Sequence, residues 1–90
     1  MAVNHFINPA MYFVYVIKSR VGKRMYVGLS SNVENRLKDH NFGRVFSTKG
    51  YRPWKLVYIE KIGSRIEARK REEYFKSGCG KEFLKSIILG

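Results

Sequence analysis

The sequence contains little of what stabilises small secreted domains. Its single cysteine, Cys79, cannot form an internal disulfide, and no group of cysteine and histidine residues has the spacing of a zinc site. No apolar run is longer than a strand, which argues against a membrane span, and residues 1–10 lack the basic and apolar segments of a signal peptide. These absences predict a cytoplasmic protein that does not contact a membrane.

Acidic residues are also scarce. The 90 residues include 7 Asp and Glu against 18 Lys and Arg, which gives a formal net charge of +11. A chain of this length buries only roughly 60% of its unfolded surface, so it has room for one core and one domain. Because 44% of the residues are hydrophobic and 14% are aromatic, the chain is not a disordered basic tail. The charge therefore predicts a folded domain whose partner is a polyanion, most commonly nucleic acid.

Three short runs of β-branched and aromatic residues predict strands over residues 12–17, 25–29 and 55–59. The first run has side chains suited to burial on both faces, as in a central strand, and the first two runs together predict a β-hairpin. Residues 1–10 have no period and include a turn-forming Asn-Pro pair, so we expect an extension there. A single domain is expected over residues 11–90.

Two capping boxes predict the starts of helices. Ser31 is followed three residues later by Glu34, and Ser64 is followed by Glu67. The first helix is expected to end near residue 41 and the second near residue 78, and apolar residues at helical spacing from 83 to 88 predict a short closing helix. The order ββαβαα predicts an α/β (α+β) fold, with a small, three-stranded, mainly antiparallel sheet flanked by helices.

Polar groups occupy unusual places on these elements. Arg36 and His40 are four residues apart, so they lie on one side of the first helix, next to its apolar stripe. Ala68, Glu72 and Phe75 follow helical spacing, which places a carboxylate within the apolar stripe of the second helix. A charged residue in such a position breaks the local pattern, and functional sites are where such exceptions are expected.

The order of these groups along the chain resembles the GIY-YIG nuclease superfamily, and in particular its small stand-alone proteins. Residues 12–17 stand where the first motif belongs, and Tyr26-Val27-Gly28 matches the second motif. Arg36 and His40 follow as they do in the helix of that family. The resemblance covers residues 11 to about 85, and the ordered set is far more specific than any one three-residue motif.

The resemblance implies a metal-dependent endonuclease that hydrolyses phosphodiester bonds in DNA. Glu72 would hold Mg²⁺ or Mn²⁺, since Mg²⁺ tolerates one carboxylate when water and phosphate complete its ligands. Arg36 would hold the scissile phosphate through a charge-assisted contact. Tyr15 and Tyr26 would orient the attacking water, and either of them could take its proton. His40 would relay a proton or hydrogen-bond a tyrosine.

Residues 44–55 interleave cations with aromatic rings and have no regular period, which predicts a loop that contacts nucleic acid. The candidate contacts are Arg44, Lys49, Arg52 and Lys55. Single-stranded, branched and duplex DNA all stay open as substrates, as do roles in DNA repair, recombination or mobile elements. So small a domain has no separate module that reads sequence, which favours selection by shape or strandedness and leaves a homodimer or a partner protein open.

Each candidate residue also has a purely structural interpretation. The tyrosines could pack within their strands, and Arg36 and His40 could lie on a solvated helix surface. Glu72 could point outward and pair with Lys76. The same charge also fits two other functions, a basic module that binds nucleic acid without cleaving it and a structural partner of RNA.

Overall fold

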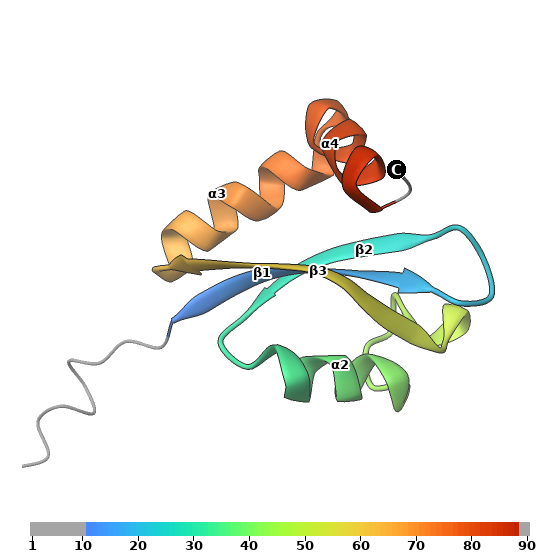
Figure 1. Ribbon diagram of the computed structural model, residues 1–90. Helices are drawn as coiled ribbons and strands as arrows, with labels where there is room; N and C mark the ends of the chain where they lie inside the picture. The colour runs from blue at the N-terminus through green and yellow to red at the C-terminus, as the bar shows by residue number, and fades with distance from the viewer. Residues whose placement is uncertain (1–10, 89–90) are drawn as a thin grey trace, which may run out of the picture.

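A computed structural model describes residues 11–88 and contains a three-stranded antiparallel sheet covered by helices on both faces (Figure 1). The strands, in the spatial order β2-β1-β3, are β1 (Tyr12–Ser19), β2 (Met25–Ser30) and β3 (Trp54–Gly63). The helices are α2 (Val33–Asn41), α3 (Arg65–Lys76) and α4 (Gly78–Ile88), with a short 3-10 turn, η1, over Lys49–Tyr51. The predicted fold class and element order are confirmed, while the proposed extension at residues 1–10 lies outside the described residues.

The central strand β1 buries side chains on both of its faces, as predicted. Val14 and Val16 point toward α3 and α4, where they pack in a cluster with Phe75. Tyr15 and Ile17 point to the other face, into a second cluster with residues of α2 and the start of β3. Figure 1 shows the sheet lying between α2 on one side and the α3–α4 pair on the other. Consecutive residues of one strand therefore serve two separate cores.

Strand β3 is five residues longer than predicted from its apolar run and begins one residue earlier. It pairs antiparallel with the whole length of β1, from Tyr12 opposite Gly63 to Ser19 opposite Trp54. Two irregularities in the register allow the longer strand to stay paired along a curved ladder. Polar residues in its second half hid this extension, because alternation with solvent-facing side chains weakens the apolar signal.

The predicted first cap, Ser31, is wrong by one residue. Helix α2 is capped by Asn32, whose side-chain oxygen accepts a hydrogen bond from the backbone N–H of Asn35 at 3.1 Å. Ser30, Ser31 and Asn32 are all competent caps, so the sequence leaves their order open. Burial of Val33 against the second cluster fixes where the helix begins, and that selects Asn32.

The second cap is confirmed, but the last helix starts earlier than expected. The hydroxyl of Ser64 accepts from the backbone N–H of Glu67 at 3.1 Å and caps α3. Helix α4 begins at Gly78, and Gly80 lies against α3, where a Cβ would approach the carbonyl oxygen of Tyr74 to 2.0 Å. The expected end of the second helix near residue 78 is confirmed, since α3 ends at Lys76, and Gly80 permits close packing of the two helices. None of the helices that the structure describes is long and apolar enough to cross a membrane.

Candidate active site

Tyr15 lies in the central strand with its ring over the neighbouring strand. It is 1% exposed and pairs across the sheet with Gly28 of β2. A Cβ added at Gly28 would lie 2.6 Å from the Tyr15 hydroxyl oxygen and 2.7 Å from its Cζ. Only glycine leaves room for the ring there, because ordinary carbon contacts are about 3.5–4.0 Å. The glycine of the second motif thus positions the tyrosine of the first.

The Tyr15 hydroxyl belongs to a buried hydrogen-bonded chain. Its oxygen is 2.8 Å from Nε2 of His40, and Nδ1 of His40 is 2.8 Å from Oγ1 of Thr48. The Thr48 hydroxyl donates to the carbonyl oxygen of Val45 at 3.3 Å, so it accepts from the imidazole. This network assigns the proton of neutral His40 to Nδ1. Nε2 therefore carries a lone pair that accepts a hydrogen bond from the Tyr15 hydroxyl.

Burial sets the protonation states of this pair. It raises the pKa of Tyr15 to about 12, with Tyr26 adding to the shift and the Arg36 guanidinium opposing it. Burial also lowers the pKa of His40 to about 4, and nearby Arg36 lowers it further while Asp39 opposes this. At neutral pH the pair is a phenol that donates to an uncharged imidazole. A cation at Arg36 favours loss of a proton from Tyr15 and disfavours a charged His40.

Tyr26 and Arg36 border the same cluster. The Tyr26 ring is 6.4 Å from that of Tyr15 and 4.9 Å from that of His40, measured between centroids. The Arg36 side chain is 39% exposed, and its Nη1 is 3.7 Å from Oδ2 of Asp39. A pair this long and this exposed leaves the guanidinium free to turn toward an anionic ligand. Tyr15, Tyr26, Arg36 and His40 are therefore brought together by β1, β2 and α2.

Glu72 approaches the cluster from α3. Its side chain is only 13% exposed, and its negative charge is among the influences that raise the pKa of Tyr15. One carboxylate oxygen is 3.3 Å from Nζ of Lys76 and the other is 3.9 Å from Nε of Arg69. The pairing with Lys76 that a surface position would give is thus present, but the carboxylate itself is largely buried.

The described residues contain no group of three or more acidic, histidine or cysteine side chains that could enclose a metal ion. A site here would rest on Glu72, with water and phosphate as the remaining ligands. That donor set suits Mg²⁺, which keeps several waters, and does not suit zinc, which takes several nitrogen or sulfur ligands from the protein. The carboxylate oxygens form ion pairs with the flexible, half-exposed side chains of Lys76 and Arg69, which can give way to a metal ion. Glu72 therefore fits a single-carboxylate magnesium site.

The four predicted DNA contacts do not lie together. Arg44 and Lys49 are exposed in the segment after α2, and Nη1 of Arg44 is 3.0 Å from Oδ1 of Asp39. Arg52 is exposed in the same segment, and its Nε donates to the carbonyl oxygen of Lys49 at 2.8 Å. Lys55 lies elsewhere, in a hollow that is also lined by Lys18, Arg20 and Ile88. The side chain of Lys55 thus belongs to a different surface from the other three.

Sequence reasoning missed the residues that hold Thr48 in place. The carboxamide of Asn41 accepts from the backbone N–H of Trp54 at 2.6 Å and donates to its carbonyl oxygen at 3.1 Å. The indole Nε1 of Trp54 donates to the carbonyl oxygen of Thr48 at 2.8 Å. These bonds tie the end of α2 to the start of β3 and bury Thr48 under His40. The only local signal was a tryptophan in a polar segment, which indicates an anchor but not its partner.

Comparison with known proteins places the chain in a family. The GIY-YIG catalytic domain family matches residues 11–82. The UPF0213 protein of Staphylococcus haemolyticus is 38% identical over 79 residues, which cover 87% of this chain and 95% of that relative. The UPF0213 protein of Clostridium perfringens is 40% identical over 67 residues, covering 73% and 71%. That of Natronomonas pharaonis is 36% identical over 69 residues, covering 76% and 80%.

The fold and the match over most of the chain define a GIY-YIG nuclease domain, and the chain belongs to that family. Among known proteins it is similar to the UPF0213 proteins, a name that states no activity.

The buried histidine predicts a specific dependence of stability on pH. The pKa of His40 is lowered from 6.5 to about 4, so the unfolded chain binds a proton at higher pH than the folded chain. The free energy of unfolding should therefore be greatest above about pH 6.5 and fall toward pH 4, by up to about 3 kcal/mol. Urea unfolding of the parent and His40→Gln at pH 7.5 and pH 4.5 measures this. Equal pH dependence in the two proteins would show that His40 is not buried in its neutral form.

Proposed function

We propose that the protein is a divalent-metal-dependent endonuclease that hydrolyses phosphodiester bonds in DNA. The observation that carries the proposal is the buried chain from Tyr15 through His40 to Thr48, with the Arg36 guanidinium beside it. A structural tyrosine needs one hydrogen-bond partner, and water supplies it readily at a surface. A neutral histidine held in one tautomer against the phenol is instead the arrangement of a proton relay.

The relay assigns different roles to the two tyrosines. The Tyr15 oxygen keeps lone pairs that can accept a proton from an attacking water while its own proton passes to Nε2 of His40. A pKa of about 4 leaves the His40 imidazole uncharged at neutral pH and makes it a weak base, so Nε2 would hold the proton only transiently during the transfer. Tyr26, packed edge-on against His40, would orient the water from the neighbouring strand. Tyr15 is accordingly the general base in this proposal.

Arg36 and Glu72 supply the remaining chemistry. The half-exposed guanidinium of Arg36 would contact a non-bridging phosphate oxygen and stabilise the charge that builds up on it. Glu72 would hold Mg²⁺ or Mn²⁺, which when bound neutralises phosphate charge and lowers the pKa of water. Both groups face the Tyr15 hydroxyl closely enough to influence its pKa, in opposite directions.

Surface charge and exposed rings support a nucleic-acid substrate. The net charge is +11, and Phe42 and Phe46 are 65% and 89% exposed on the segment that carries Arg44. The Arg44 guanidinium lies 4.9 Å from the centre of the Phe42 ring. Aromatic rings next to cations bind unstacked bases and phosphates together, so we propose selection of DNA by structure or strandedness. A repair or mobile-element role, a cytoplasmic location and a homodimer stay predictions.

A cleavage assay separates this function from the alternative, a module that binds nucleic acid and cleaves nothing. The parent should cut at least one of single-stranded, branched or duplex DNA when Mg²⁺ or Mn²⁺ is present and none when EDTA is present. Tyr15→Phe should cut about 10²–10⁴-fold more slowly because it lacks the relayed proton. The same panel made of RNA tests the remaining alternative. Absence of cleavage with every substrate and metal would establish the binding module instead.

A further inference from the structure

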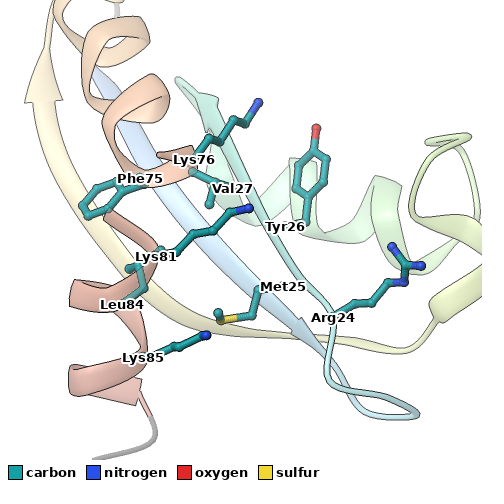
Figure 2. Close-up of a pocket in the computed structure, with 9 residues that line it drawn as sticks. All are labelled: Arg24, Met25, Tyr26, Val27, Phe75, Lys76, Lys81, Leu84 and Lys85. Atoms are coloured by element: carbon teal, nitrogen blue, oxygen red, sulfur yellow. The ribbon is translucent and has the colours of Figure 1, made fainter. Parts of the chain in front are cut away.

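A groove of about 570 Å³ runs between β2 and α4 (Figure 2). None of the residues that line it belongs to the segment after α2. Its floor is formed by Met25 together with the buried side chains Val27, Phe75 and Leu84. Lysine side chains from the two helices reach over this floor toward β2 in Figure 2. The groove is therefore apolar at its base and charged along its walls.

All the charged side chains that line the groove are cations. They are Arg24 beside β2, Lys76 at the end of α3, and Lys81 and Lys85 on α4. Within residues 11–88, the ion pair of Lys85 is long and exposed, 3.9 Å from Glu82 in the preceding turn of the helix. Exposed pairs of this kind contribute little, so the lysine stays available to another anion. Lys76 is paired with Glu72 and the Arg24 guanidinium lies 4.3 Å from the centre of the Tyr51 ring, so Lys81 and Lys85 are the cations that a polyanionic occupant would meet.

The groove is continuous with the candidate active site. Tyr26 lines its upper end, and its ring also packs on His40. Lys76 lines the same end, and its ammonium nitrogen is 3.3 Å from Oε2 of Glu72. If the scissile phosphate of a DNA strand lay at Arg36 and Glu72, the next phosphates of that DNA strand would thus lie in the groove.

We propose that this groove binds a single-stranded DNA segment next to the scissile phosphate, an inference that rests on the proposed function. Phosphates would contact Lys81 and Lys85, while an unstacked base would lie against Met25 and the aliphatic stems of the lysines. A duplex would leave the apolar floor unused, because its bases are stacked and its phosphates face outward. The protein would then select sites where one strand is unpaired beside the cleaved bond.

Binding of a fluorescein-labelled oligothymidylate of twelve nucleotides tests whether the cations of the groove contact phosphates. EDTA in the buffer prevents cleavage. Each lost phosphate contact lowers the log–log salt slope for a single strand by about 0.7, so Lys81→Gln with Lys85→Gln should lower it by about 1.4. A decrease of about 1.4 in the slope corresponds to about 25-fold weaker binding at 0.1 M salt. The matched control, Lys61→Gln with Lys70→Gln, removes the same charge from exposed positions outside the groove. Equal losses in the two double variants would overturn the proposal.

Photo-crosslinking locates the bases and identifies the class of ligand. The same oligonucleotide carrying 5-iodouracil should crosslink to residues 24–27 or 81–85, whereas crosslinks confined to residues 42–52 would overturn the proposal. Poly-glutamate that competes as well as the oligonucleotide would also overturn it, since it would indicate an acidic protein partner. Groove crosslinks in a protein that cleaves nothing would keep this site and reject the nuclease. Cleavage without binding in the groove would keep the nuclease and reject this site.

Discussion

Glu72→Gln should slow DNA cleavage by about 10³-fold or more while leaving DNA affinity within about twofold. The substitution keeps the size of the side chain and removes the charge that would hold the metal, whose loss costs several kcal/mol of transition-state stabilisation. Affinity should persist because it comes mainly from the many cations on the surface. Single-turnover cleavage and anisotropy titrations on the same DNA measure the two effects separately.

The neighbouring residue provides the control for this substitution. Glu73 carries the same charge on the same helix but is exposed, so Glu73→Gln should cleave at the parental rate. Glu72→Gln also loses its contact with the half-exposed Lys76, which should change the free energy of unfolding by no more than about 1 kcal/mol. Cleavage by Glu72→Gln as fast as by Glu73→Gln would show that the metal ligand is elsewhere.

Gly28→Ala should disable the site without altering any group that takes part in chemistry. The new Cβ would lie within 2.9 Å of three atoms of the Tyr15 side chain, so the ring must move by about 1 Å to restore ordinary contacts. The Tyr15 ring is closely packed, and any such movement stretches its 2.8 Å bond to His40. Misplacement on this scale costs about 10²-fold in rate, and overpacking costs about 1–3 kcal/mol of stability.

Thermal unfolding and cleavage together test this prediction. The melting temperature should fall by roughly 4–24 °C, given about 4–8 °C per kcal/mol in a domain of this size. Gly22→Ala is the control, since a Cβ there meets nothing within 4 Å. If Gly28→Ala melted and cleaved as Gly22→Ala does, the Tyr15 ring would not depend on the glycine for its position.

The groups of the candidate site were largely identifiable from spacing. A separation of four residues placed Arg36 and His40 on one face of α2, and the interruption of an apolar stripe singled out Glu72. Those inferences need only the period of a helix, which the sequence displays directly. Lys55 fell outside the segment it was grouped with, because a strand begins at Trp54 and turns the next side chain to the other face of the sheet.

Local sequence signals predicted the ends of helices less well where several neighbouring residues could play the same structural role. Ser31 and Asn32 are both good caps, and only the burial of Val33 selects the second. Gly78 correctly marked the end of α3, but nothing in the local sequence showed that Gly80 serves the contact between two helices. In both cases the deciding contact is made with a residue distant in sequence or outside the local pattern.

The sequence by itself determined the class of fold and the excess of positive charge, which depend on composition and on local periods of two and 3.6 residues. Its resemblance to the GIY-YIG family, and not periodicity alone, singled out the tyrosines, arginine, histidine and glutamate. The tertiary structure alone decided which nitrogen of His40 holds its proton and why Tyr15 stays a phenol at neutral pH. Both follow from burial and from Thr48, a partner eight residues away that no helical or strand period connects to the histidine. The same packing gathers part of the excess positive charge along one groove, which leads away from Tyr26.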